Sequence, residues 1–305
     1  MNYRHLLLSS LVFSAMLAST VSAQSVRTFV ASTGSDANPC SRTAPCRTLQ
    51  AAFNAAASGG EVVALDSAGF GSNLSINKSI SIIGPPGIYA GITVFSGDGI
   101  DINAGAGDTV TLRGLTIVNQ SSGVNGIVFT TGAALYIESC IVNGFNPGGS
   151  GVAFQGPGNL VVHDSAFRNN GDGIALGGST TATLDQVRLE ANTNGLDAKD
   201  GVRVNVRNSV VSENIEGLFA ASSTAAPVEM NVENCLVSYS VDTGIIAGQN
   251  STGTTTVRVS NSTIINNGNF GLHNFAPATL LSRGNNTIEG NGTNTVGTIS
   301  SYMAK

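Results

Sequence analysis

The sequence predicts an all-β fold in which parallel strands coil into a single-domain solenoid behind one capping helix. Three observations predict it: strand-like segments recur along the chain, a glycine followed by an aliphatic residue recurs at the same interval, and polar residues mark the bends between them. Glycine accounts for 38 of the 305 residues and charged residues for only 11%. This composition is typical of many short strands joined by tight turns.

The repeat spans about 22 to 27 residues and has two landmarks in each copy. A period of this length fits one coil of a right-handed parallel β-helix, in which a coil buries its apolar face only by stacking on its neighbours. A leucine-rich repeat would need leucines at fixed positions, where this chain has Val, Ile, Ser and Cys. The strand segments centre on 111–117, 136–142, 162–167, 184–189, 206–211, 232–237 and 259–264, and the glycine pairs are Gly126-Ile127, Gly151-Val152, Gly173-Ile174, Gly195-Leu196, Gly217-Leu218, Gly244-Ile245 and Gly271-Leu272.

Alternation within each strand points every second side chain into the solenoid. We therefore expect Val162, Ser165 and Phe167 to face inward and His163 to face outward. The equivalent inward row holds Leu112, Ile137, Val162, Leu184, Val206, Val232 and Val259.

Two polar rows mark the bends between strands. Asn tolerates turn conformations, and its amide can hydrogen-bond from one coil to the next. The first row is Asp164, Gln186, Asn208, Asn234 and Asn261, and the second is Asn170, Asn192, Asn214, Ser240 and Asn267.

The four cysteines divide into two kinds. Cys40 and Cys46 share a short loop with two prolines, and we expect them to form a disulfide in an oxidising compartment. Cys140 and Cys235 fall in one inward row four coils apart, about 19 Å at ~4.8 Å per coil, which is beyond disulfide reach. They are predicted to be buried free thiols.

The chain ends predict the remaining organisation. Residues 1–23 have the apolar run and small-residue cleavage site of a signal peptide, cut after Ala23, so the protein is expected to be secreted or periplasmic. Residues 24–60 are interpreted as a loop and a capping helix over 47–60. Residues 61–290 are interpreted as the β-helix and 291–305 as a C-terminal tail.

Composition also limits the partners. The pI near 5.1 and the lack of a basic run argue against nucleic acid. After the signal segment, no apolar run is long enough to span a membrane. We expect a monomer that needs no cofactor.

The chain resembles the secreted bacterial right-handed β-helix proteins of the pectin-lyase-like superfamily. The residues that carry the resemblance are TFVASTGSDANPC (28–40), CRTLQAAFNAAASGGEVVAL (46–65) and the coils that follow them, nearly the whole mature chain. The resemblance implies the fold and, by analogy, a carbohydrate ligand. It does not imply one activity, because the superfamily includes lyases, hydrolases, epimerases and adhesins.

One outward column concentrates the reactive side chains. It holds Arg113, Glu138, His163, Asp185, Arg207, Glu233 and Ser260, beside a column of Thr111, Tyr136, Val161, Thr183, Asn205, Asn231 and Arg258. Alternating charges on successive coils would form an ion-pair ladder that stabilises the stack. Alternatively, His163 or Asp185 would act as a general base on a bound sugar, with Arg207 stabilising developing charge. The expected ligand-binding residues are Tyr136, Glu138, Asn205 and Glu233.

Metal and hydrolase patterns are not visible in the sequence. No close acidic trio suggests calcium and no Cys/His spacing suggests zinc, so no metal site is predicted. A hydrolase that resembles the polygalacturonases would need paired aspartates together with Gly-His-Gly and Arg-x-Lys elements. The chain has none of these elements. Asp172 is interpreted as a turn residue, and Asp197, Lys199 and Asp200 as a solvated charged loop.

Three functions remain open on the sequence alone. The protein could bind extracellular or cell-surface polysaccharide along its outward columns without a catalytic centre. It could be a polysaccharide lyase or glycoside hydrolase that uses the region of His163, Asp185 and Arg207. It could also be a structural or adhesive surface protein whose partner face is formed by exposed Val128, Phe219 and Ile246.

Overall fold

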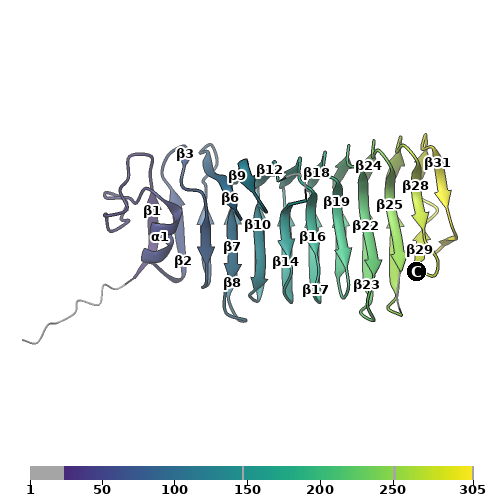
Figure 1. Ribbon diagram of the computed structural model, residues 1–305, viewed down its shortest axis with the longest axis horizontal. Coiled ribbons are helices and arrows are strands. Elements are labelled where there is room, and N and C mark those ends of the chain that lie inside the picture. The colour runs from purple at the N-terminus through teal and green to yellow at the C-terminus, as the bar shows by residue number, and fades with distance from the viewer. Residues whose placement is uncertain (1–23, 146–147, 250–251, 304–305) are drawn as a thin grey trace, which may run out of the picture.

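The computed structural model describes residues 24–145, 148–249 and 252–303, and in them three parallel sheets wind about one long axis (Figure 1). Each full coil contributes one strand to each sheet, and each strand pairs with the equivalent strands of the coils before and after it. The right-handed parallel β-helix predicted from the repeat is confirmed. The proposed signal segment, 1–23, lies outside the described residues.

We name the sheets A, B and C. Sheet A contains β1 (Ser25–Val30), β2 (Ala56–Ala64), β5 (Ile80–Ile83), β8 (Thr109–Arg113), β11 (Ala134–Glu138), β14 (Gly158–His163), β17 (Thr180–Asp185), β20 (Arg203–Arg207), β23 (Val228–Glu233), β26 (Thr255–Ser260), β29 (Thr279–Ser282) and β32 (Ile299–Ser301). Sheet B contains β3 (Ala68–Gly69), β6 (Ala90–Gly97), β9 (Leu115–Gly123), β12 (Ile141–Asn143), β15 (Ala166–Arg168), β18 (Arg188–Glu190), β21 (Val210–Ser212), β24 (Leu236–Ser238), β27 (Thr263–Ile265) and β30 (Thr287–Glu289). Sheet C contains β4 (Leu74–Ile76), β7 (Ile100–Asn103), β10 (Ile127–Thr131), β13 (Ser150–Phe154), β16 (Asp172–Leu176), β19 (Asn194–Lys199), β22 (Glu216–Ser222), β25 (Thr243–Gln249), β28 (Phe270–Asn274) and β31 (Thr293–Val296).

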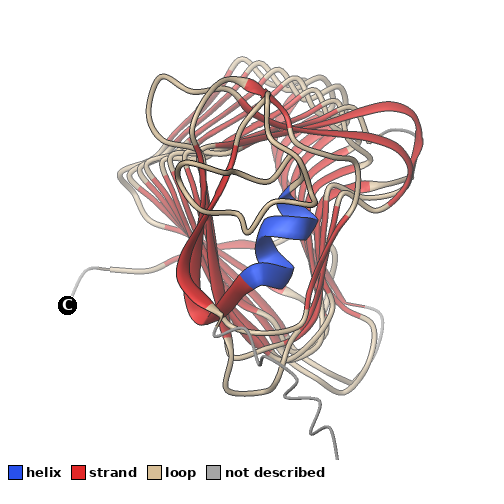
Figure 2. Cartoon of the chain, turned by 90° about the vertical axis from the view of Figure 1, so that its left-hand side faces the viewer, coloured by secondary structure: helices blue, strands red, loops and turns tan. Residues whose placement is uncertain are grey.

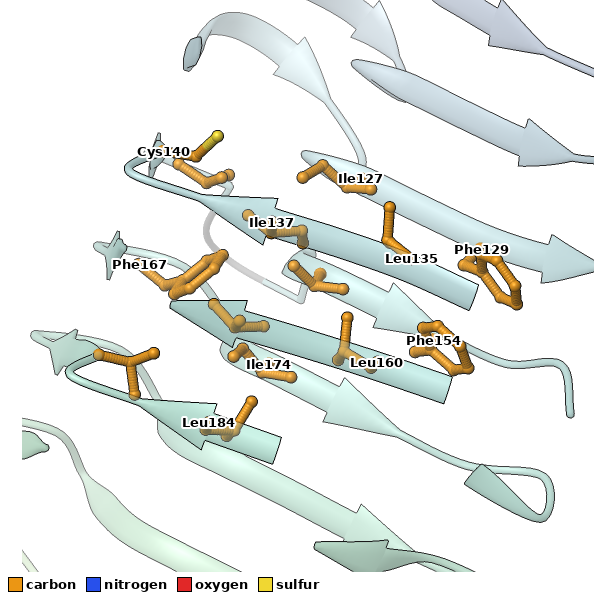
Figure 3. Close-up of a cluster of buried hydrophobic side chains, with 14 of the residues drawn as sticks. Ile127, Phe129, Leu135, Ile137, Cys140, Phe154, Leu160, Phe167, Ile174 and Leu184 are labelled. Atoms are coloured by element: carbon orange, nitrogen blue, oxygen red, sulfur yellow. The ribbon is translucent and has the colours of Figure 1, made fainter. Parts of the chain in front are cut away.

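The interior is filled by stacked rows of aliphatic side chains (Figure 3). The predicted inward row is confirmed, since Ile137 pairs with Leu112 on one side and Val162 on the other, and all three are fully buried. Phe129 and Phe154 stack in the same way, with ring centroids 4.0 Å apart. The coils therefore share one continuous core, as the repeat requires.

The bend between sheets A and B is made by residues in the left-handed conformation. The predicted row Asp164, Gln186, Asn208, Asn234 and Asn261 has φ between 48° and 57° at every position. Asn and Asp tolerate this conformation better than other side chains because their short polar groups bond locally. The first polar row is therefore a backbone requirement.

The second polar row makes the predicted hydrogen bonds between coils but does not hold the predicted turn positions. Its left-handed residues lie one position earlier, at Asn169, Ala191, Glu213, Tyr239 and Asn266. The row at Asn170, Asn192, Asn214, Ser240 and Asn267 is buried. The side-chain oxygens of Asn170, Asn192, Asn214 and Asn267 accept from backbone N–H groups of the coil before, which the bend removes from the sheets. The Ser240 hydroxyl is buried without a hydrogen-bond partner.

A third row of small residues lines the same end of sheet A. The thiols of Cys140 and Cys235 are free and buried there, as predicted. Serine hydroxyls of this row accept hydrogen bonds from the coil before: Ser165 from the Cys140 N–H at 3.0 Å, Ser209 from the Val187 N–H at 3.2 Å, and Ser262 from the Cys235 N–H at 3.1 Å.

The N-terminal end is closed by a helix and a disulfide loop. Helix α1 (Leu49–Ala55) lies across the opening of the solenoid (Figure 2) and buries Leu49, Ala52 and Phe53. Thr48 caps it, its hydroxyl accepting from the Ala51 N–H at 3.2 Å. The predicted Cys40–Cys46 disulfide is present.

Three predicted boundaries differ from the structure. The helix is shorter than 47–60, because from Ala56 the chain enters β2 and pairs with both β1 and β5. Residues 24–60 also contain strand β1, not only loop and helix. At the other end, 291–305 is not a separate tail, since β31 and β32 continue sheets C and A beyond residue 290. The apolar period is too weak there to reveal strands made of Thr, Asn and Ser.

Candidate functional site

The reactive side chains predicted to share an outward column of sheet A do share it. Strand pairing stacks Arg113, Glu138, His163, Asp185, Arg207, Glu233 and Ser260, one on each coil. The same pairing stacks Thr111, Tyr136, Val161, Thr183, Asn205, Asn231 and Arg258 beside them.

The charges of the first column pair with one another. Arg113 Nη2 lies 2.6 Å from Glu138 Oε2. Asp185 Oδ2 lies 3.0 Å from Arg207 Nη2 and 3.9 Å from His163 Nδ1. Opposite charges thus meet between coils, which removes the repulsion that like charges would cause in the stack.

Asp185 is poorly suited to act as a base. A 2.8 Å hydrogen bond from Asn208 Nδ2 is the largest influence that holds the pKa of this carboxyl below its usual range, and the charge and hydrogen bond of Arg207 lower it further. A carboxylate with a lowered pKa binds protons weakly and makes an inefficient general base. The geometry therefore favours a structural role for Asp185.

The four predicted ligand-binding residues lie in two shallow grooves on sheet A. One, of about 320 Å³, is lined by Tyr136 and Glu138. The other, of about 380 Å³, is lined by Asn205 and Glu233. The coil that carries His163 separates the two grooves along the column, so the four residues do not converge on one pocket.

The outward face of sheet C carries a second group of ionisable side chains. Asp197 and Lys199 are not in a solvated loop, as predicted, but in strand β19, and Asp197 is only 6% exposed. Their side chains meet at 2.5 Å, from Lys199 Nζ to Asp197 Oδ2. Asp200, at the following bend, accepts from the Ser223 N–H at 2.7 Å and orders the next coil's turn. Asp172 is the first residue of β16 rather than a turn residue.

Burial and nearby negative charges raise the pKa of two carboxyl groups on this face. Burial raises the pKa of Asp197, and Asp172 raises it further, against the opposing effect of Lys199. Burial also raises the pKa of Glu216, one coil further on, and the charges of Asp242 and Asp197 add to that increase. Carboxyl groups with a raised pKa are common at functional sites.

A groove of about 450 Å³ opens over this part of sheet C. Asp172, Asp197 and Lys199 supply its charged lining, and small residues such as Ala175 and Gly177 leave room above the strands.

An apolar strip continues from the groove toward the C-terminus. Asp197 pairs with Phe219 on the next coil, Phe219 with Ile246, and Ile246 with His273. The His273 ring lies 4.7 Å from that of Phe270 and 3.8 Å from that of Phe275, between centroids. Burial lowers the pKa of His273, which favours the neutral ring.

The sequence predicted that Val128, Phe219 and Ile246, which lie on three strands of sheet C, are exposed. This prediction is wrong for two of the three residues. Val128 is 9% exposed and Ile246 only 3%. Of the three, only Phe219 is partly accessible.

Within the described ranges, no group of three or more His, Cys, Asp or Glu side chains has the geometry to hold a metal ion. The same part of the chain contains no helix with the length and hydropathy needed to cross a membrane.

Comparison with known proteins identifies the family. Residues 98–258, more than half of the chain, match the family model described as a right handed beta helix region. The chain belongs to this family. No curated protein sequence matches it.

Three solved structures are similar to the whole solenoid. An alginate lyase from Paenibacillus sp. str. FPU-7 aligns at TM-score 0.58 and 14% identity, over 90% of this chain and 100% of that one. A rhamnogalacturonan lyase aligns at TM-score 0.56 and 15% identity, over 91% and 86%. The pectate lyase Pel9A aligns at TM-score 0.52 and 17% identity, over 91% and 77%. At these identities the likeness concerns the fold alone.

Proposed function

We propose that the protein is exported and binds extracellular or cell-surface polysaccharide along the outward face of sheet A, without a catalytic centre there. The observation that carries the proposal is a column of hydroxyl and amide side chains that runs beside an ion-paired ladder. A surface of this kind offers many hydrogen bonds with little net charge, which suits a chain of sugar hydroxyl groups.

Two details support this face as a binding surface. Tyr136 is 37% exposed. An exposed tyrosine can pack its ring against a ligand while its hydroxyl remains hydrogen-bonded to water. Asn231 Nδ2 donates to Asn205 Oδ1 at 3.0 Å, so these two amides hold each other in place before any ligand arrives. A side chain that is already ordered loses less conformational entropy on binding.

The structural neighbours support carbohydrate as the ligand class. Three of them, all similar in fold, are named as lyases of alginate, rhamnogalacturonan and pectate.

The catalytic alternative has less support at the predicted residues. Asp185 already accepts hydrogen bonds from Asn208 and Arg207, and its lowered pKa opposes proton uptake. The adhesive alternative loses its basis at Val128 and Ile246, which are buried.

Export is supported by the disulfide. Cys40 and Cys46 are joined in a short loop, and such bonds persist in oxidising compartments. The signal segment at 1–23 stays a prediction, and sequencing the N-terminus of the exported protein tests it, with Gln24 expected as the first residue.

The test is a binding panel of neutral and uronate-containing polysaccharides, measured by affinity electrophoresis of the purified protein. Tyr136→Ala and Asn205→Ala are expected to weaken retention at least fivefold. Thr263→Ala, on sheet B, is the matched control and should bind as the wild type does. Unsaturated ends and reducing ends are followed in the same samples. If unsaturated ends or new reducing ends appear, the protein is an enzyme and the proposal of binding without catalysis is wrong. If all three variants are retained equally, the polysaccharide does not bind at sheet A.

A further inference from the structure

Charge is distributed unequally among the three sheets. The strands of sheet A carry five arginines and His163 against five carboxylates, and those of sheet B carry two of each sign. The strands of sheet C carry four carboxylates against one lysine and one histidine: Asp101, Asp172, Asp197 and Glu216, with Lys199 and His273. Two further acids, Asp98 and Asp242, lie at its leading edge. The negative charge of the protein is therefore concentrated on sheet C.

The carboxylate of Asp197 is incompletely satisfied within the fold. Its Oδ2 atom pairs with Lys199, but its Oδ1 atom is buried and has no hydrogen-bond partner. A buried acceptor without a donor costs about 1–3 kcal/mol. Asp197 lines the groove on sheet C, so a small side-chain movement would offer this oxygen to a donor from a ligand.

The neighbouring acids favour a donor that is positively charged. Glu216 lies one coil beyond Asp197, and the charges of Asp197 and Asp242 both act on it. Asp172 acts on Asp197 from the coil before. Asp172 and Glu216 stack in one column on either side of Asn194, and Asp197 lies three positions further along the strand between them. These like charges repel one another, and a bound cation would relieve this repulsion. A polyanion would increase it.

The apolar strip beside the acids favours a ligand with flat hydrocarbon faces. Phe219 follows Asp197 in the same column, and the rings of Phe270, His273 and Phe275 end it. Phe275 is 50% exposed. Sugar rings present such faces at regular intervals along a chain, whereas a basic peptide presents mobile side chains.

We propose that the outward face of sheet C binds a polysaccharide with free amino groups, a glucosamine-type chain, whose ammonium groups meet Asp197 and Glu216 and whose rings pack on the accessible aromatic side chains of this face, Phe219 at one end and His273 with Phe275 at the other. This site is separate from the sheet A face, so either proposal can fail alone.

The test is isothermal titration of the full-length mature protein with three oligosaccharides of equal length. The glucosamine oligomer carries ammonium groups, its N-acetylated form is neutral, and the galacturonate oligomer is anionic. We expect the glucosamine oligomer to bind at least tenfold more tightly than the N-acetylated form, and the galacturonate oligomer not to bind at this face. Equal binding of the charged and neutral oligomers would overturn the proposal.

Two variants locate the site. Glu216→Gln and Asp197→Asn are each expected to reduce affinity for the glucosamine oligomer about tenfold, whereas Glu289→Gln on sheet B should leave it unchanged. Circular dichroism and the urea midpoint show whether each variant is folded, and Glu216→Gln provides the test if Asp197→Asn is not. If Glu289→Gln loses as much affinity for the glucosamine oligomer as Glu216→Gln does, the oligomer responds only to the net charge of the protein. That result would overturn the proposal.

Two further measurements separate the alternatives. A cationic ligand lowers the proton affinity of the acids that it meets, so binding at about pH 5 should release protons, and titration in buffers of different ionisation enthalpy measures this release. An oligolysine of equal charge that binds more tightly than the glucosamine oligomer would assign the face to basic peptides instead. Loss of glucosamine binding in Tyr136→Ala but not in Glu216→Gln would overturn the sheet C site and leave the sheet A proposal standing.

Discussion

Asn192 Oδ1 accepts two hydrogen bonds from Asn170 of the preceding coil, one from the backbone N–H at 3.0 Å and one from the side-chain amide at 3.1 Å. Asn214 does the same for Asn192, at 2.9 and 3.0 Å. Both side chains are buried. From Asn170 to Asn214 the bend between sheets B and C is thus joined by a chain of amides, each satisfying the coil before it.

Removal of one amide from this chain should destabilise the solenoid. Asn192→Ala leaves the buried donors of Asn170 without an acceptor, and we expect the free energy of unfolding to fall by about 2–4 kcal/mol. Urea denaturation followed by circular dichroism measures the change. Thr193→Ala, the exposed neighbour, is the control and should cost less than about 0.5 kcal/mol. Similar losses in both variants would refute the role of the ladder.

The left-handed row predicts a conformational effect. Gln186 has φ 57°, and a β-branched residue is strained in that region. Gln186→Val should therefore reduce stability by about 1–2 kcal/mol, while Gln186→Asn should leave it unchanged or raise it. Thermal melts of the two variants compare them directly. If Val is tolerated as well as Asn, the backbone there does not hold the left-handed conformation in solution.

The cysteines should differ sharply in reactivity. Burial raises the pKa of both Cys140 and Cys235 to about 11, and only the thiolate reacts. In the folded protein at mildly alkaline pH, a thiol reagent should label neither residue. In guanidinium it should label these two, and all four cysteines only after reduction. Labelling of Cys40 or Cys46 before reduction would exclude the disulfide.

Asp185 should contribute stability that depends on its charge. Its pKa in the folded state is lowered by the hydrogen bond from Asn208 and by Arg207 and His163. Its contribution is therefore present above the unfolded pKa, near ~3.9, and is lost as pH falls through the folded value. The stability difference between wild type and Asp185→Asn, from urea midpoints, should shrink as pH falls from about 7 to 3. A constant difference would mean that the carboxylate charge is not coupled to folding.

Glu216 should show the opposite dependence. Burial and the charges of Asp242 and Asp197 raise its pKa, so the folded protein binds this proton more tightly than the unfolded chain does. Its contribution is present below the unfolded pKa, near ~4.3, and is lost as pH rises through the folded value. Glu216→Gln should therefore gain stability relative to wild type on going from about pH 4 to 7. Parallel pH profiles for the two proteins would contradict the raised pKa.

The coils could be predicted because their requirements repeat. Every inward position must be apolar or small and every first-bend position must adopt a left-handed backbone, so Val162 and Asn208 each have equivalents on neighbouring coils. The second bend was misplaced by one residue, because Ala191, Glu213 and Tyr239 share the conformation but no chemical pattern.

The charged side chains on the face of sheet C were not placed there from the sequence, for a physical reason. Asp197 and Lys199 precede Asp200 and Gly201, and four such residues together are typical of a loop. Pairing with Phe219 and burial by adjacent coils keep Asp197 in a strand instead. The repeated glycines could have revealed the position of Asp197. The residue two positions after each repeat glycine, from Val128 to His273, lies in one outward column of sheet C.

The serine bonds near Cys140 and Cys235 have a consequence for how the chain can change length. Along this row the acceptors alternate with residues that accept no such bond: Cys140 with Ser165, Val187 with Ser209, and Cys235 with Ser262. A serine of the row can also donate, since the Ser262 N–H bonds to Asn286 Oδ1 on the next coil at 2.8 Å. Deletion of a single serine coil would therefore leave the backbone N–H of the preceding Cys140 or Val187 without its hydroxyl acceptor. Deletion of that coil together with the next one would instead present the following serine hydroxyl to the same N–H.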